Sequence, residues 1–100
     1  MTWRLLRVAE SAKKGKKLDA FFEDDRGRGK VVSFGAVGYE DYTTHHDKDR
    51  RERYRTRHAA REDWNDATSP GALSLWILWG PTTSVQKNVA AYRKRFWMDK

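Results

Sequence analysis

The sequence predicts an α+β domain in which a three-stranded antiparallel meander precedes three helices packed on one face, in the order βββααα. The first third of the chain alternates apolar and polar residues with the period of a strand. The remainder carries helix-capping residues and apolar positions with helical spacing. Because 100 residues allow one domain with one modest core, we expect residues 1–100 to fold as a single unit.

Three strands are expected in the first third of the chain. Residues 3–8 alternate along a short run with one mainly apolar face, and residues 18–23 alternate in the same way. A third strand, residues 30–37, contains the β-favouring run "VVSF". The Lys/Gly loop at 11–17 and the turn "DDRGRGK" connect these strands tightly, which predicts antiparallel pairing of consecutive strands.

The next two expected helices have clear start signals. Asp47 or Asp49 is the N-cap of a basic helix that extends to about Arg61. The stretch "WNDATSPG" ends it, and Ser69 followed by Pro70 is the N-cap and first position of a short helix that contains "ALSLWILW" and ends before Gly-Pro. Since this helix is apolar nearly all round, we expect it at the buried centre.

The last expected helix starts at Thr83 and Gln86, which have capping-box spacing. Its apolar positions follow one helical stripe: Val85, Val89, Tyr92 and Phe96. Combined with the strands, the pattern predicts a core of large apolar side chains: Phe22, Val32, Phe34, Trp76, Leu78, Val89 and Phe96.

Composition restricts the class of protein. The five tryptophans and 13% aromatic residues favour a folded chain, and the net charge of +7 with a pI near 9.9 favours polyanionic partners. The absence of cysteine excludes disulfides, thiol chemistry and cysteine-ligated zinc. No apolar run has the length of a membrane span and the N-terminus lacks a signal-peptide core, so we expect no membrane span and no secretion by a signal peptide.

Charge alternates along the chain in blocks. Residues 1–17, 47–61 and 87–100 are net basic, whereas residues 18–46 and 62–86 each carry a net charge of three negative. This arrangement predicts one basic face and one acidic face on a small fold.

No pattern indicates catalysis or a cofactor, and we expect neither an enzyme nor a metalloprotein. His45, His46 and His58, with Asp47 nearby, are the only metal-like cluster, but adjacent histidines in an extended loop point to opposite sides and do not converge on one ion. Solvated or hydrogen-bonded imidazoles are the simpler interpretation. No serine has a nucleophile-elbow context, and the glycines of "RGRGK" lack the remainder of a phosphate-binding loop.

The basic helix is the candidate partner-binding site. At 100° per residue, one side collects four arginines, one tyrosine and one histidine: Arg50, Arg51, Arg57, Arg61, Tyr54 and His58. An aromatic ring among arginines suits a phosphate with a base or sugar stacked beside it. The alternative is structural, with Tyr54 packed inward on the sheet and the arginine stems lying around it.

The chain also resembles a known family. The shared pattern includes "FG" at 34–35, "GY" at 38–39, Asp41-Tyr42-Thr43, His45, Asp47, Arg51, Tyr54, Arg57-His58, Trp64, Gly71-Ala72, Ser74, Trp76, Leu78-Trp79 and "YRKRF" at 92–96. It covers roughly residues 18–97 and is similar to an uncharacterised family of short basic proteins encoded by nucleocytoplasmic large DNA viruses of algae and protists. One departure is Leu75, where the resemblance leads us to expect a basic residue after the serine.

The resemblance implies a viral protein located in the virion or in the infected host cell, its cytoplasm or viral factory. It favours a small minor capsid or cement protein that contacts other virion proteins, with the major capsid protein as a possible partner. The alternative is a basic nucleic-acid-binding protein that condenses or regulates viral DNA. The net acidic blocks and the tryptophans near both termini favour the first hypothesis, because a tile between neighbours uses two oppositely charged faces.

The residues before the basic helix have a structural interpretation as well. Asp41 and Thr43 are expected to hydrogen-bond the loop backbone, and His45, Asp47 and His58 to join this loop to the helix. We therefore predict a loop-to-helix clamp over residues 41–58, with outer arginines that face a partner.

Overall fold

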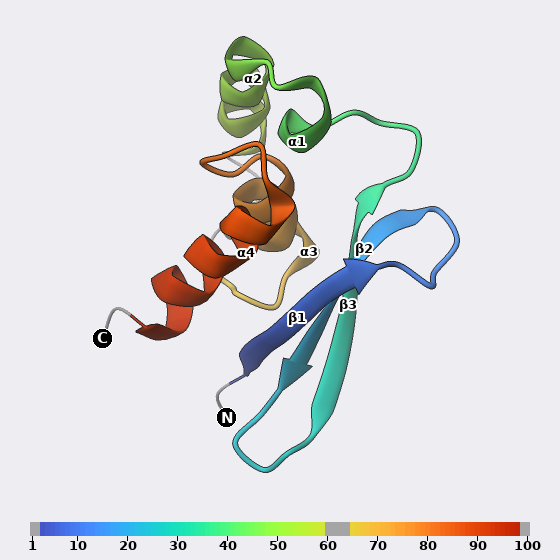
Figure 1. Cartoon of the computed structure of the whole chain (residues 1–100), viewed down its shortest axis with the longest axis vertical. Helices are drawn as coiled ribbons and strands as arrows, with labels where there is room; N and C mark the ends of the chain where they lie inside the picture. Colours follow the sequence, from blue (N-terminus) through green and yellow to red (C-terminus); the bar gives the residue numbers. More distant parts are fainter. Residues whose placement is uncertain (1–2, 60–64, 99–100) are drawn as a thin grey trace.

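A computed structural model of the chain describes residues 3–59 and 65–98. Three strands, β1 (Arg4–Glu10), β2 (Lys16–Glu23) and β3 (Gly29–Ala36), form one antiparallel sheet in the order β1-β2-β3 (Figure 1). Helices follow the sheet in the chain, so the predicted α+β class and the three-stranded meander are confirmed.

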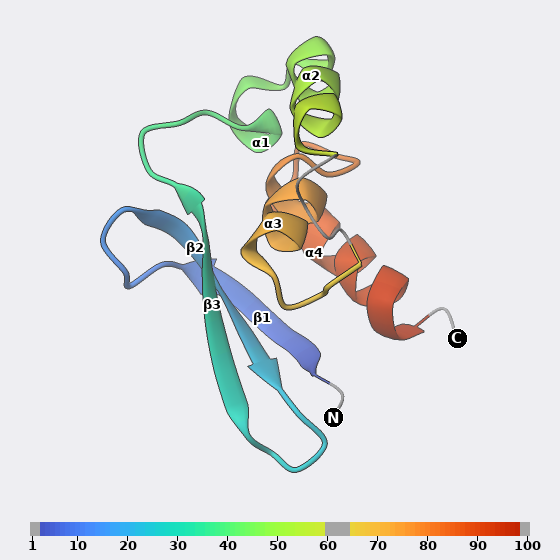
Figure 2. The ribbon, with the colours of Figure 1, turned by 180° about the vertical axis from the view of Figure 1, so that it is seen from behind.

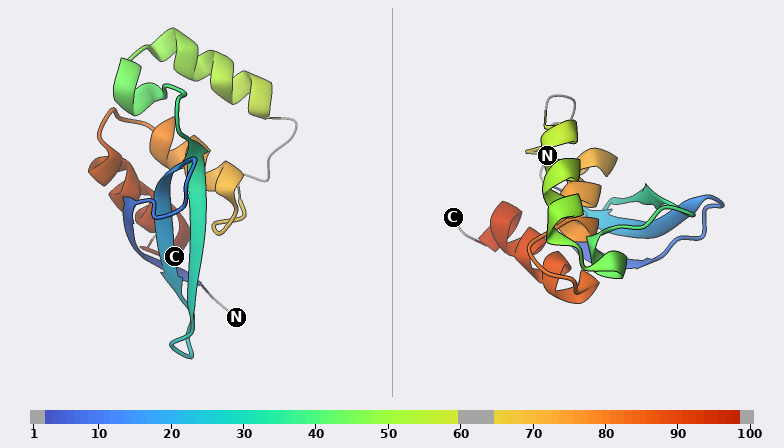
Figure 3. Two further views of the ribbon diagram at one scale, coloured as in Figure 1. Left: turned by 90° about the vertical axis from the view of Figure 1, so that its right-hand side faces the viewer. Right: turned by 90° about the horizontal axis from the view of Figure 1, so that it is seen from above.

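The helical part contains a short helix that the sequence pattern did not predict. The segments are α1 (Tyr42–His45), α2 (Lys48–His58), α3 (Pro70–Leu73) continued by η1 (Ser74–Leu78), and α4 (Val85–Arg93) continued by η2 (Lys94–Met98). Seen from behind, α3 and α4 lie together beside the sheet (Figure 2). The α3–η1 segment and α4 pack against the sheet, whereas α2 lies beyond the end of β3, above the other helices (Figure 3).

The sheet presents one apolar face to the helices. Across the strands, Ala20 pairs with Val32 and Leu18 with Phe34, so alternate residues of β2 and β3 point into the core. The alternation is interrupted in β2, where Asp19 and Ala20 are both buried, and in β1, where the pairing register shifts between residues 5 and 7. This bulge leaves Leu6 47% exposed on the outside of the domain.

Side-chain caps start the helices where their sequence signals lie. Asp47 accepts hydrogen bonds from the N–H groups of residues 49 and 50, and Ser69 accepts one from residue 72, with Pro70 at the first turn of α3. The predicted Thr83–Gln86 capping box was wrong by one residue. Ser84 is the N-cap of α4, because its hydroxyl reaches the N–H of Lys87.

The α3–η1 segment is the centre of the core, as its sequence predicted. Four of its side chains are almost fully buried: Leu73, Leu75, Ile77 and Leu78. Of the predicted core, Phe22, Val32, Phe34 and Leu78 are buried, while Trp76, Val89 and Phe96 are partly buried and pack against the cluster. Tyr92 is buried too, and its hydroxyl donates to the carbonyl of Ala67 at 2.6 Å. Burial raises the pKa of this phenol well above its ordinary value.

The end of η1 positions Trp79 for the site described below. The N–H of Trp79 donates to the carbonyl of Ser74, five residues earlier, at 3.0 Å, which is the hydrogen bond of a π-helical turn. The chain then leaves through Gly80, where a Cβ atom would stand 2.1 Å from the carbonyl oxygen of Trp76. Only glycine fits so close to the helix backbone, and this residue lies where the chain turns away from the end of η1.

Candidate functional site

A cleft of about 500 Å³ opens between α2, the sheet end at which β2 starts and β3 finishes, and the α3–η1 segment. Its charged lining is mostly basic: Lys16, Lys17, Arg50 and Arg57 against Glu40 and Asp41, with His58 beside them. Four cationic groups against two carboxylates leave a net charge of two positive with the histidine neutral. Its aromatic lining is Phe34, Tyr39, Tyr54 and Trp79.

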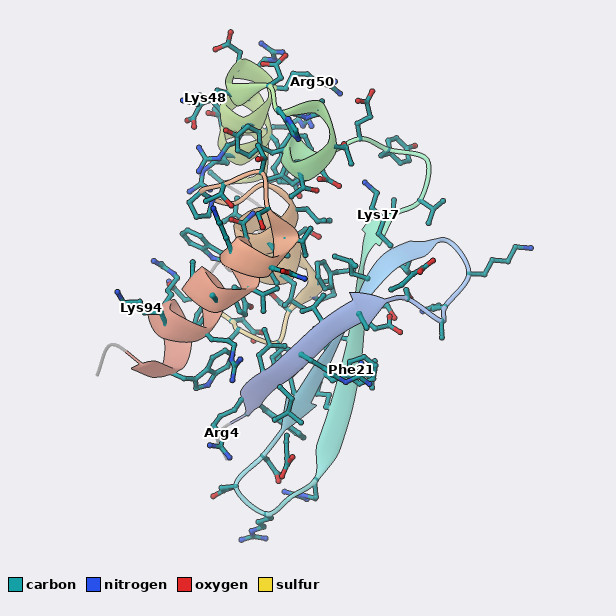
Figure 4. All side chains as sticks on the ribbon, viewed as in Figure 1. Arg4, Lys17, Phe21, Lys48, Arg50 and Lys94 are labelled. Atoms are coloured by element: carbon teal, nitrogen blue, oxygen red, sulfur yellow. The ribbon has the colours of Figure 1, made fainter. Side chains whose placement is uncertain are left out.

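Two of the cations are paired with the two carboxylates. The Nζ of Lys17 lies 2.6 Å from Oδ2 of Asp41, whose side chain is only 3% exposed (Figure 4 shows Lys17 pointing toward α1). The guanidinium of Arg50 lies 3.9 Å from Glu40, and both of these side chains are well exposed. The first pair is therefore a fixed part of the wall, while the second is solvated and contributes little to stability.

The other two cations have no such partner. Within residues 3–59 and 65–98, neither Lys16 nor Arg57 makes an ion pair, and Arg57 is exposed on the last turn of α2. One of them comes from β2 and the other from α2, so uncompensated positive charge stands on two different walls of the cleft. An anion between them would neutralise both.

The floor of the cleft is a stack of three rings. Tyr54 lies between His58, at a centroid distance of 4.1 Å, and Trp79, at 4.2 Å with an interplanar angle of 4°. Both faces of the tyrosine ring are therefore covered. The structural alternative placed Tyr54 on the sheet. In the structure its ring packs on Trp79 at the end of η1 instead.

The arginines of α2 separate into two groups. Arg51 donates from Nε to the carbonyl of Gly80 at 2.7 Å, and Arg55 donates to the carbonyl of Trp79 at 3.3 Å. These bonds satisfy carbonyls at the end of η1 and attach α2 to it. Burial, and then the neighbouring charge of Arg51, lowers the pKa of Arg55.

The predicted partner-binding set is thus divided. Arg50, Tyr54 and Arg57 line the cleft. Arg51 does not face outward with them as predicted, because its guanidinium is held at the Gly80 carbonyl. Arg61 lies outside the described residues.

The predicted clamp is present as a network around α1. Asp41 is the N-cap of α1 and accepts from the N–H and the hydroxyl of Thr43, while its own N–H donates to Thr44 Oγ1. The N–H of Asp47 donates to Nδ1 of His45 at 2.9 Å, which joins α1 to α2. The Arg50 N–H is the main reason that the pKa of Asp47 lies below its usual value.

The two histidines of the clamp differ in their surroundings. Because Nδ1 of His45 accepts a hydrogen bond, its neutral ring carries the proton on Nε2. That atom is buried and has no hydrogen-bond partner among the described residues, and the ring lies 5.2 Å from Trp79 at 56°, a placement suited to a weak contact with the indole. The ring of His58 stacks on Tyr54 inside the cleft, and its predicted contact with the loop stays a prediction.

No metal site forms among the residues that the structure describes, since no three His, Asp or Glu side chains gather there. That the protein is not an enzyme and binds no cofactor therefore stays a prediction from the sequence.

Sequence reasoning missed several residues of the cleft, among them Lys16, Lys17 and Tyr39. Lys16 and Lys17 belong to a Lys/Gly-rich stretch whose composition predicts a loop, and Tyr39 stands out in the sequence only as part of the family pattern. These residues lie too far from α2 along the chain for strand or helix periodicity to indicate that they meet it in space. A tyrosine directly after a glycine, in a segment expected to turn, is the one sequence signal for this part of the cleft.

The fold and the cleft define a small α+β protein whose basic, aromatic cleft lies between its sheet and its helices. The chain belongs to the family of unknown function DUF5754, whose model matches residues 6–58. The match begins in β1 and ends at the last residue of α2, so it includes the sheet wall and the helix wall of the cleft. No curated protein and no solved structure matches the chain.

The family match leaves the source of the protein open, so the viral origin that the resemblance implies remains a prediction. In the described part of the chain, none of the helices has the length and apolar character needed to cross a membrane.

Proposed function

We propose that this protein is a non-enzymatic nucleic-acid-binding protein that holds a phosphate backbone in the cleft between α2 and the sheet. The observation that carries the proposal is the pair Lys16 and Arg57, two cations without ion-pair partners among the described residues on separate walls of one aromatic-lined cleft. Basic side chains interleaved with aromatic rings are the usual composition of nucleic-acid sites.

The positions of the carboxylates favour a nucleic-acid-binding protein over a virion structural protein with an acidic face. Three of the six carboxylates in residues 18–46 are buried: Asp19, Asp24 and Asp41. Asp19 accepts hydrogen bonds from Ser11 and Ser33, Asp24 from Arg28, and Asp41 from Lys17. The remaining three carboxylates share the segment with Arg26 and Lys30, since Arg28 is already paired with Asp24, so this block provides only a weakly acidic surface.

The two groups of arginines support the same conclusion. Arg51 donates a hydrogen bond to a backbone carbonyl and stabilises the fold. The side chain of Arg57 makes no hydrogen bond or ion pair within the described residues and is available to a ligand. Arg50 is held only by a solvated pair at 3.9 Å, which a phosphate displaces at little cost.

Salt-dependent binding of a fluorescent oligonucleotide tests the proposal. Each phosphate contact steepens the slope of log K against log salt by about 0.7 for a single strand or about 0.9 for duplex DNA. We expect Arg57→Ala and Lys16→Ala each to flatten the slope by about one contact. Lys48→Ala is the matched control, because Lys48 is an exposed cation of the same helix that points away from Arg50 (Figure 4).

Absence of binding at low salt would refute the proposal. Equal slopes for Arg57→Ala, Lys16→Ala and Lys48→Ala would place the binding outside the cleft and refute it as well. Circular dichroism of each variant confirms that the fold is retained.

A second candidate is the virion structural role, in which the protein contacts other virion proteins as a minor capsid or cement component. The outer face of the sheet favours it: Val31 is 54% exposed there, and its cross-strand neighbour Phe21 has Arg7 over its ring at 3.9 Å. Recovery of the protein among the components of purified particles, together with weak nucleic-acid binding, would favour this candidate over the first.

A further inference from the structure

Tyr39 is an aromatic side chain that the fold does not use. It is 75% exposed, the most exposed large apolar side chain among the described residues, yet it lines the basic cleft. Phe34 is buried and Tyr54 is covered on both faces, whereas the exposed ring of Tyr39 makes no ring contact within the described residues.

The loop that carries Tyr39 is anchored on both sides. Before it, the N–H of Val37 donates to the carbonyl of Gly15 at 3.0 Å, and after it Asp41 is fixed as the N-cap of α1. Gly38 turns the chain between these anchors with a φ of 94°, a conformation that favours glycine. The backbone that carries Tyr39 is therefore fixed on both sides, which keeps the ring in the lining of the cleft.

The size and chemistry of the cleft match an unpaired nucleotide. A volume of about 500 Å³ lies within the range of pockets that hold one drug-sized molecule. Stacking needs a base with a free face, which single strands offer and the interior of a duplex does not. Lys16 and Arg57 line the same cleft as Tyr39 and supply the positive charge that the phosphates flanking such a base require.

We infer that the cleft selects single-stranded over duplex nucleic acid, with one unpaired base stacked on Tyr39 and the adjacent phosphates on Lys16 and Arg57. This inference rests on the proposed function and specifies its ligand. It assigns the base contact to Tyr39 and leaves Tyr54, whose two faces are already covered, as a part of the cleft floor.

Binding of a labelled 12-nucleotide oligothymidylate and of a 12-base-pair duplex at one salt concentration tests the inference. We expect the single strand to bind more tightly, and Tyr39→Ala to weaken it by about 5-fold to 150-fold, the usual loss for one stacked base. Tyr39→Phe keeps the ring and should retain the affinity, whereas Tyr39→Leu keeps apolar bulk without a π face and should not. The salt slope of Tyr39→Ala should equal that of the unchanged protein, because the phosphate contacts remain.

The outcomes separate this inference from the proposed function. Duplex binding as tight as single-strand binding, with no effect of Tyr39→Ala, overturns the single-strand inference and leaves the nucleic-acid proposal standing. Equal losses for Tyr39→Phe and Tyr39→Ala also overturn it, because the hydroxyl and not the ring would then carry the contact. Absence of binding to either probe overturns both.

Discussion

The ring of Tyr54 lies parallel to the indole of Trp79, with 4.2 Å between the ring centroids and 4° between the planes. This contact joins the middle of α2 to the residue that follows η1. Because α2 has no buried residue, its position depends on this stack, on the bonds from Arg51 and Arg55 to backbone carbonyls, and on the hydrogen bond between Asp47 and His45 that joins it to α1. The helix wall of the cleft is therefore held by this aromatic stack together with a small number of polar contacts.

Replacing Tyr54 by alanine should loosen that wall. We expect a loss of about 2–3 kcal/mol in the free energy of unfolding, less than for a fully buried aromatic residue because Tyr54 is only half-buried. Tyr54→Phe keeps both stacked faces and should lose less. Thr56→Ala, an exposed change on the same helix, is the control, and urea denaturation followed by circular dichroism measures all three. Near-native stability of Tyr54→Ala would show that the stack does not hold α2.

Two neighbouring residues of η1, Trp76 and Ile77, should contribute differently to the stability of the core. Ile77 is fully buried, so Ile77→Ala should cost about 2–5 kcal/mol, a large part of the stability of a domain of this size. Trp76 is only partly buried, with the guanidinium of Arg95 4.0 Å from its ring, and Trp76→Ala should cost less. Chemical denaturation of both variants compares them. A larger loss for Trp76→Ala would mean that the indole, and not the aliphatic row of η1, dominates the core.

Asn88 holds the connection between η1 and α4. Its buried amide donates to the carbonyls of Ile77 and Thr82, both at 2.8 Å, and its oxygen accepts from the N–H and hydroxyl of Thr82. Asn88→Asp has the same shape but no N–H, so two carbonyls lose their donor and a charge is buried. We expect a loss of at least about 2 kcal/mol at neutral pH.

The control for that change is Gln86→Glu, the same amide-to-carboxylate replacement at an exposed position of α4. The deficit of Asn88→Asp should shrink when acid protonates the new carboxyl and restores one donor. A deficit that matches Gln86→Glu at every pH would contradict the assigned role.

Local signals in the sequence account for most of the fold. Strand alternation and the caps Asp47 and Ser69-Pro70 act within a few residues, so the meander and two helix starts could be predicted. The Leu6 bulge and the one-residue shift from Thr83 to Ser84 could not, because each depends on which neighbour happens to be within bonding distance in the folded domain.

The cleft is harder to predict because it is tertiary. Helical periodicity predicts that Arg50 and Arg51 lie on one side of the helix. In the structure, Arg51 donates a hydrogen bond to the carbonyl of Gly80, whereas Arg50 lines the cleft. No periodicity indicates where that carbonyl lies. Lys16 and Tyr39 reach the site only through the register of β2 with β3, which brings Lys16 opposite Ala36.

Acid should destabilise the domain through its buried aspartates. The hydroxyls of Ser11 and then Ser33 lower the pKa of Asp19. Burial alone would raise the pKa of Asp24, but the backbone N–H groups of Arg28 and Arg26 and the Arg28 guanidinium outweigh it, and the net direction is downward.

The sign of the effect follows from these directions. As the pH falls below about 4, the ordinary value for an aspartate in an unfolded chain, the unfolded protein takes up protons before the folded protein does. The stabilisation from both groups is therefore complete above that pH and is lost as the pH falls through their lowered folded-state values. We expect the urea midpoint to fall steeply below about pH 4.

Asp19→Asn and Asp24→Asn should each be less stable than the unchanged protein at neutral pH and should each show a shallower decline in acid. Asp25→Asn is the control, because Asp25 is an exposed neighbour in the same turn without a side-chain partner in the described part of the chain. Urea titrations at half-unit steps from pH 7 to pH 2.5 measure the decline. If the Asp19→Asn/Asp24→Asn double variant lost stability in acid as steeply as Asp25→Asn, the acid sensitivity would have to arise from carboxylates other than these two buried groups.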